Sequence, residues 1–70
     1  MSISEKILSL KKEKEVKTSI VCKEIGIPRS TWDSIVKDGV LPGTKVIIKI
    51  CKYFNVSADW LLGLNEEKNN

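Results

Sequence analysis

The 70-residue sequence predicts an all-α domain of five short helices. Apolar residues recur at three- and four-residue intervals in each predicted segment, which is the period of a helix with one buried side. Residues that start or end helices stand between these segments: Ser2, Gly26, Pro28, Ser57 and Gly63. A single segment is also compatible with a strand, and the sequence offers no second strand to pair with it.

The first helix is predicted at about residues 3–14. Ser2 and Glu5 form an S-x-x-E capping box ahead of it. Ile7 and Leu10 lie on its apolar side, while lysine and glutamate residues occupy the other side. We therefore expect one side of this helix to cover a core and the other to face water.

The next two helices are predicted at about 18–25 and 28–37, joined by a tight turn. Gly26 stands where the first of them ends, a place that favours the left-handed backbone that glycine adopts without a Cβ clash. Pro28 is predicted at the first position of the following helix, where its missing N–H loses nothing. Two helices joined by so short a turn form a helix-turn-helix unit, whose second helix enters the DNA major groove.

The fourth helix is predicted at about 44–54, although its residues 46–50, VIIKI, are rich in β-branched side chains that strands favour. Apolar residues fall at i, i+3, i+4 and i+7 counted from Ile47, and the segment is long for a strand. A fifth helix is predicted at 57–62, with a serine cap at its start and Gly63 after its end.

The apolar sides of these helices are expected to converge on a single core. Its predicted members are Ile7, Leu10, Val21, Ile25, Ile27, Trp32, Ile35, Ile47, Ile50, Phe54 and Leu61. The helix-turn-helix domain is expected to span residues 1–64. Residues 65–70, NEEKNN, have nothing to bury and are predicted to form a flexible polar tail.

Composition argues against several classes of function. No apolar run exceeds three residues, so we expect no membrane span or signal peptide and a soluble, cytoplasmic protein. The absence of histidine, of a glycine-rich phosphate loop and of paired carboxylates in a plausible cleft argues against an enzyme. Cys22 and Cys51 are too few for a structural zinc site and are expected to fill close helix contacts. No metal, cofactor or small-molecule ligand is evident.

Charge is unevenly distributed along the chain, whose formal net charge is +3. Eleven of the twelve Lys and Arg residues lie in residues 1–56, whereas residues 57–70 hold one Lys against three acidic residues. Such an asymmetry is expected when one face of a protein meets a polyanion, although an ordinary solvated surface is the alternative.

Residues 18–35, TSIVCKEIGIPRSTWDSI, resemble the helix-turn-helix of the lambda and Cro type of repressor, also called the xenobiotic-response-element family. Residues 46–63, VIIKICKYFNVSADWLLG, are similar to that family's fourth and fifth helices. The resemblance runs from about Ile3 to Leu64. It implies a compact five-helix, lambda-repressor-like fold in which helices two and three form the helix-turn-helix.

Three departures from the family pattern affect the expected helix packing and DNA-facing surface. Trp32 takes a place usually held by a smaller aliphatic residue, so the third helix is expected to lie slightly further from the second. Ile20 occupies a position that is often polar in the family. The recognition side has only Arg29 and Lys37 as basic residues. By contrast, alanine is typical of the family at both cysteine positions, which supports their structural role.

The recognition helix is expected to turn one side toward DNA bases. The expected base contacts are Arg29, Ser30, Ser34 and Asp33. Arg29 leads because a guanidinium can pair bidentately with guanine O6 and N7, with a phosphate contact as the alternative. Asp33 could accept a hydrogen bond from cytosine N4, pair with Arg29 or point sideways, and the pairing is favoured.

Contacts to phosphates are expected from a second set of residues. These are Thr18, Lys17, Thr31, Lys37 and Lys45. The resemblance implies a phosphate contact at the position of Thr18, whose hydroxyl could instead, or in addition, cap its helix.

A single copy is expected to bind DNA weakly, because the recognition side has few basic residues. The resemblance implies pairing through the fourth and fifth helices and palindromic half-sites about one DNA turn apart. The candidates for the dimer contact are Ile48, Trp60 and Leu64, with Trp60 as part of its own chain's core as the alternative for that residue.

The sequence therefore favours a regulator that binds double-stranded DNA sequence-specifically. Its expected form is a small repressor of phage or mobile-element type that occupies a palindromic operator as a homodimer. The alternative is a protein-interaction module on the same fold, such as an antitoxin-like or antirepressor partner. In that alternative, Ile20, Trp60 and Leu64 would matter more than Arg29.

Overall fold

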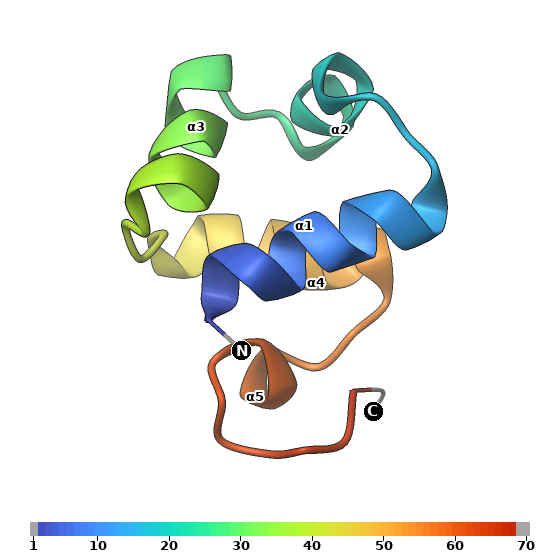
Figure 1. Cartoon of the computed structure of the whole chain (residues 1–70), viewed down its shortest axis with the longest axis vertical. Helices are drawn as coiled ribbons and strands as arrows, with labels where there is room; N and C mark the ends of the chain where they lie inside the picture. Colours follow the sequence, from blue (N-terminus) through green and yellow to red (C-terminus); the bar gives the residue numbers. More distant parts are fainter. Residues whose placement is uncertain (1, 69–70) are drawn as a thin grey trace.

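The computed structural model describes residues 2–68, which contain five helices and no strand (Figure 1). The helices are α1 (Ile3–Lys14), α2 (Thr18–Ile25), α3 (Arg29–Asp38), α4 (Thr44–Phe54) and α5 (Ala58–Leu61). The predicted all-α class is confirmed, and α1, α2 and α4 have the expected bounds. α3 begins and ends one residue later than expected, and the outer residues of the expected fifth helix, Ser57 and Leu62, are the caps of α5.

The five helices form a body measuring 28 × 22 × 20 Å. α1 crosses its middle with α4 behind it, while α2 and α3 lie together at one end (Figure 1). α1 contacts α3 and α5, and α4 contacts α2 and α5. The helix-turn-helix pair and α5 therefore occupy opposite ends of the molecule, so neither covers the surface of the other.

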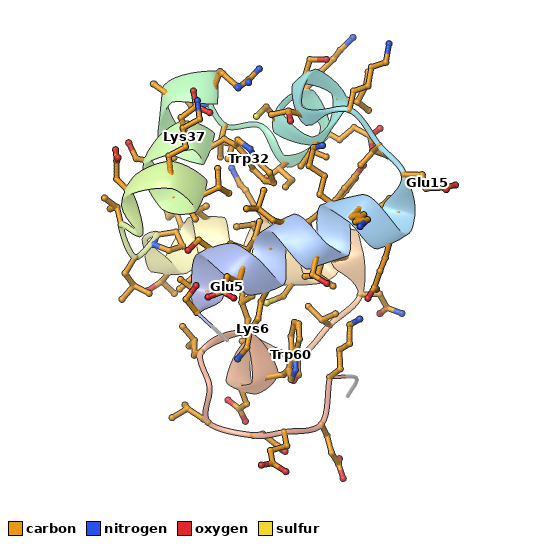
Figure 2. All side chains as sticks on the ribbon, in the orientation of Figure 1. Glu5, Lys6, Glu15, Trp32, Lys37 and Trp60 are labelled. Carbon is orange, nitrogen blue, oxygen red and sulfur yellow. The ribbon has the colours of Figure 1, made fainter. Side chains whose placement is uncertain are left out.

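Side chains from all five helices meet in one hydrophobic core. Its buried members are Ile7, Leu10, Val21, Cys22, Ile25, Trp32, Ile35, Ile47, Ile50, Cys51, Val56 and Leu61. Trp32 reaches from α3 into the interior between the helices (Figure 2). Ile27 and Phe54, which were expected in this core, are only partly buried at its edge, because both lie at helix ends where packing is one-sided.

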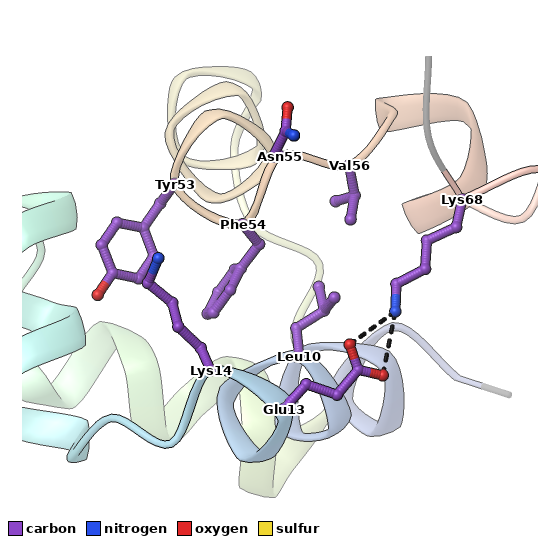
Figure 3. Close-up of a pocket in the computed structure, with 8 residues that line it drawn as sticks. All are labelled: Leu10, Glu13, Lys14, Tyr53, Phe54, Asn55, Val56 and Lys68. Atoms are coloured by element: carbon purple, nitrogen blue, oxygen red, sulfur yellow. Dashed lines mark hydrogen bonds and ion pairs between the residues drawn. The ribbon is translucent and has the colours of Figure 1, made fainter.

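Residues 65–68 fold back toward the helices, with residues 65–67 exposed and Lys68 half-buried. The Ser57 backbone N–H donates to the Lys68 carbonyl at 2.8 Å, and the Lys68 ammonium lies 2.8 Å from a Glu13 carboxylate oxygen (Figure 3). The same ammonium lies 5.6 Å from the centre of the Trp60 ring. Residues 69 and 70, the remainder of the predicted tail, lie outside the described residues.

Burial also governs the chemistry of the two cysteines, which lie in the core as expected. Burial raises the pKa of the Cys22 thiol, an effect that the nearby Arg29 partly opposes and Asp33 adds to. Burial raises the pKa of the Cys51 thiol as well. Both thiols therefore stay protonated at neutral pH and are poor nucleophiles.

The raised thiol pKa values predict a loss of stability at alkaline pH. Above the ordinary thiol pKa of 9.0, the unfolded chain releases protons that the folded chain keeps, so the free energy of unfolding falls as pH rises. Urea denaturation at neutral pH and at about pH 9.5 measures this decline. A Cys22→Ala/Cys51→Ala variant is expected to decline less steeply, and an equal decline in both proteins would contradict the prediction.

Candidate nucleic-acid interface

The turn between α2 and α3 sets the angle at which α3 leaves the body. Gly26 ends α2 with a φ of +83°, in the left-handed region expected for this position. The N–H groups of Gly26 and Ile27 both donate to the Cys22 carbonyl, at 2.8 and 3.0 Å. This pair of bonds closes the end of α2 within a single residue and frees the chain to start a new helix.

Pro28 lies one residue earlier relative to α3 than the sequence predicted. It is the N-cap, with φ −65° and an extended ψ of 152°, so the helix begins at Arg29. Its carbonyl accepts the first helical hydrogen bonds, from the N–H groups of Thr31 and Trp32 at 3.1 and 3.2 Å. Arg29 consequently stands at the very start of α3, the end that contacts bases in a helix-turn-helix unit.

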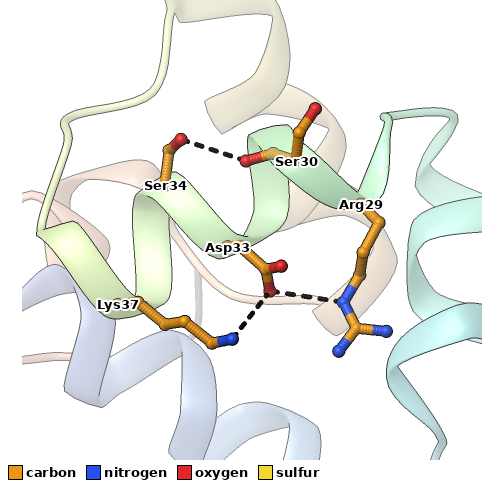
Figure 4. Close-up of polar contacts among 5 residues, drawn as sticks. All are labelled: Arg29, Ser30, Asp33, Ser34 and Lys37. Carbon is orange, nitrogen blue, oxygen red and sulfur yellow. Dashed lines mark hydrogen bonds and ion pairs between the residues drawn. The ribbon is translucent and has the colours of Figure 1, made fainter.

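Three of the predicted residues form one charged row along the outer side of α3 (Figure 4). Arg29 Nε donates to Asp33 Oδ1 at 3.2 Å, and Lys37 Nζ lies 3.8 Å from the same oxygen. The Arg29 side chain is 60% exposed. The favoured pairing of Arg29 with Asp33 is thus present. The contact of Lys37 with Asp33 was not predicted, although Lys37 follows Asp33 by the same four-residue step.

Ser30 and Ser34 form a second pair on α3. The Ser34 hydroxyl donates to the Ser30 carbonyl at 3.0 Å, while the Ser30 hydroxyl points away from the helix (Figure 4). In this arrangement Ser34 offers only acceptor lone pairs to an outside partner, whereas the exposed Ser30 hydroxyl can donate or accept. Ser30 is therefore the more versatile of the two predicted base contacts.

The start of α2 carries two of the predicted phosphate contacts. Lys17 is the N-cap and makes no side-chain capping bond, and Thr18 is the first helical residue. The alternative role of Thr18 as a helix cap is therefore wrong, because the cap position precedes it. The first amides of α2 with a helical partner are those of Ile20 and Val21, both bonded to the Lys17 carbonyl. The N–H groups of Thr18 and Ser19, which precede them, have no partner within the helix and form the positive end of its dipole.

The remaining predicted phosphate contacts lie on α3 and α4. Thr31 is half-buried on α3, and Lys45 is exposed in the first turn of α4. Sequence reasoning passed over Lys49, whose ammonium comes within 4.0 Å of the point where a Cβ on Gly26 would stand. The four-residue step from Lys45 to Lys49 was the available signal, since it puts both on one side of α4.

The candidates for a contact between two copies differ in exposure. Leu64 is 76% exposed and Ile48 45% exposed. Trp60 is half-buried, packs against the core, and has the Lys6 ammonium 5.1 Å from its ring centre (Figure 2). Lys6 also donates to the Trp60 carbonyl at 2.6 Å. Trp60 therefore already makes several contacts within its own chain.

Other kinds of site find little support in residues 2–68. A groove of about 410 Å³ lies between α1 and the end of α4, bordered by the Lys68–Glu13 ion pair (Figure 3). No group of three potential metal ligands comes together in the described part of the chain. None of the helices there has both the length and the apolar character to cross a bilayer.

Comparisons with known proteins agree with this geometry. A model of the Cro/C1-type HTH DNA-binding domain family matches residues 6–67. The fold is similar to that of the P22 c2 repressor, crystallised in complex with the synthetic operator 9T in the presence of Tl+. The TM-score is 0.83 at 17% sequence identity, covering 93% of this chain and 98% of that one. No curated protein matches the chain in sequence.

Proposed function

Because this chain belongs to the Cro/C1-type HTH DNA-binding domain family, we propose that it is a small repressor that binds an operator sequence-specifically. It contains a double-stranded DNA-binding domain, and family and fold are those of regulators rather than enzymes. Repression would follow from occupancy of the operator in the cytoplasm, without chemistry. A phage or mobile-element origin is part of the proposal, supported by the fold shared with the P22 c2 repressor.

The single observation that carries sequence specificity is the free guanidinium edge at the start of α3. Arg29 uses Nε for Asp33 and has no hydrogen bond from either terminal nitrogen within residues 2–68. An α-helix with its side chains is about 10–12 Å across, which matches the major-groove width of about 12 Å. The exposed side of α3 can therefore lie in that groove with Arg29 and Ser30 toward the bases.

Affinity would come from phosphate contacts spread over the start of α2, α3 and the start of α4 rather than from the net charge of α3. The helix holds two basic and two acidic residues, so its net charge is zero. Thr18, Lys17, Thr31, Lys37 and Lys45 would supply the phosphate contacts. Phosphate contacts fix the position of a protein on the duplex without carrying sequence information.

We also propose that the operator is palindromic and binds two copies of the chain. Successive major grooves on one side of a duplex lie about 34 Å apart, which exceeds the 28 Å length of this body. The exposed Ile48 and Leu64 and the half-buried Trp60 would contribute to the two-fold contact. α5 lies at the end remote from α2 and α3, so such a contact leaves α3 free for DNA (Figure 1).

A two-stage binding experiment tests this function. Mobility shift of a random duplex at about 50 and 200 mM salt should show an affinity that falls steeply, with a logarithmic slope of about −0.9 per phosphate contact. Selection from a random duplex pool should then yield a two-fold symmetric site with half-sites about 10 base pairs apart. Absence of retardation even at low salt would instead favour the protein-interaction module.

A further inference from the structure

Within the charged row on α3, the pair of Arg29 with Asp33 has a geometry that helix stability does not explain. Arg29 is the first residue of the helix, where the positive end of the dipole repels a cation, and the first turn contains no acidic residue. The cation also precedes the anion in the pair with Asp33, which is the weaker order for two residues four apart. The Arg29 side chain is 60% exposed and the Asp33 side chain is half-buried at 33%, so water still screens the pair and it stabilises the helix little.

The contact does, however, restrict how Arg29 can meet a ligand. Asp33 takes the Nε–H, so the guanidinium turns that edge toward α3 and keeps the two terminal nitrogens for an outside partner (Figure 4). Two N–H groups on one edge match the paired O6 and N7 acceptors of guanine. Lys37 lies 3.8 Å from the same Asp33 oxygen, and this second cation helps to hold the carboxylate in place.

We propose that Asp33 is a positioning residue that orients Arg29 for guanine and does not itself contact a base. This inference rests on the proposed function. An arginine already held in its binding rotamer loses less side-chain entropy when it meets guanine. Asp33 would thus sharpen the preference for one base pair in each half-site while its negative charge lowers affinity for every phosphate backbone equally.

The test compares base preference with general affinity in Asp33→Ala. Duplexes that carry either the selected guanine or another base at the Arg29 position are titrated by fluorescence anisotropy. We expect the preference for guanine to fall about 2- to 10-fold, the factor that ordering a long side chain costs, and affinity for random duplex to hold or rise. Asp33→Glu keeps a carboxylate within reach of Arg29 and should retain most of the preference.

Two further variants separate positioning from the other roles open to Asp33. Added to Arg29→Ala, Asp33→Ala should change the preference at that position no further, because the oriented group is already gone. An unchanged guanine preference in Asp33→Ala would overturn the proposal. The proposal would also be overturned if Asp33→Ala lost a preference for a cytosine that Arg29→Ala retained, since Asp33 would then contact that base directly. Failure of the unaltered protein to bind any duplex at low salt overturns the proposed function, and this inference with it.

Discussion

Arg29→Ala is expected to weaken binding to the selected duplex about 5- to 150-fold, which corresponds to about 1–3 kcal/mol for a bidentate contact to guanine. Folding should not suffer. The side chain is 60% exposed and stands at the positive end of the α3 dipole, so its removal leaves the free energy of unfolding unchanged or slightly higher. Anisotropy titration and thermal denaturation of the same sample measure the two effects.

The matched control for this variant is Lys45→Ala, which removes one exposed cation from the first turn of α4. It should weaken the selected and the random duplex by the same factor and reduce the salt slope by about one. Arg29→Ala should instead abolish the preference for the selected duplex at one base pair. Equal losses on both duplexes in Arg29→Ala would mean that Arg29 contacts a phosphate.

The largest effect on stability is expected from Trp32→Ala. Trp32 is 2% exposed and reaches from α3 into the core, and truncation of a buried tryptophan costs about 3–5 kcal/mol. A chain of 70 residues has a free energy of unfolding of only about 4–10 kcal/mol. The variant should therefore lose between about a third and all of this free energy, seen as a much lower thermal midpoint by circular dichroism at 222 nm.

Two comparisons make the Trp32 prediction specific. Ile20→Ala alters an exposed residue of α2 and should shift the unfolding midpoint little. Trp32→Phe keeps most of the buried ring and should lie between that variant and Trp32→Ala. A loss of less than about 1 kcal/mol in Trp32→Ala would contradict the role of Trp32 as the residue that anchors α3.

The helix bounds were predictable because residues that cap helices stand at their ends in the sequence. Ser2 caps α1 together with Glu5, and Ser57 accepts from the Trp60 N–H at the start of α5. In α4, the spacing of apolar residues outweighed the strand preference of its β-branched residues, because only a helix buries Ile47 and Ile50 on one side. Local signals of this kind need no knowledge of the rest of the chain.

What escaped prediction depends on contacts between distant residues or on single residues outside a helical period. Val56 is buried directly after Asn55, a left-handed residue, and donates to the Cys51 carbonyl at 3.0 Å. Ile27 holds the same place after Gly26, so the pattern at one helix end could have predicted the other. The ion pair of Lys68 with Glu13 spans 55 positions in sequence and has no local signal.

In the candidate site, too, some features were predictable from the sequence and others were not. Which residues of α3 face outward follows from the buried side that Trp32 and Ile35 define, and the sequence is sufficient for that. Which nitrogen of Arg29 is already engaged is a matter of rotamers, and only the coordinates assign Nε to Asp33.

The central claim is that α3 presents Arg29 to the major-groove edge of a guanine. Replacement of that guanine by 7-deazaguanine removes the N7 acceptor while leaving base pairing intact. The unaltered protein is expected to lose affinity for the substituted duplex, and Arg29→Ala is expected to bind both duplexes equally. An equal loss in both proteins, or no loss in the unaltered protein, would contradict the claim.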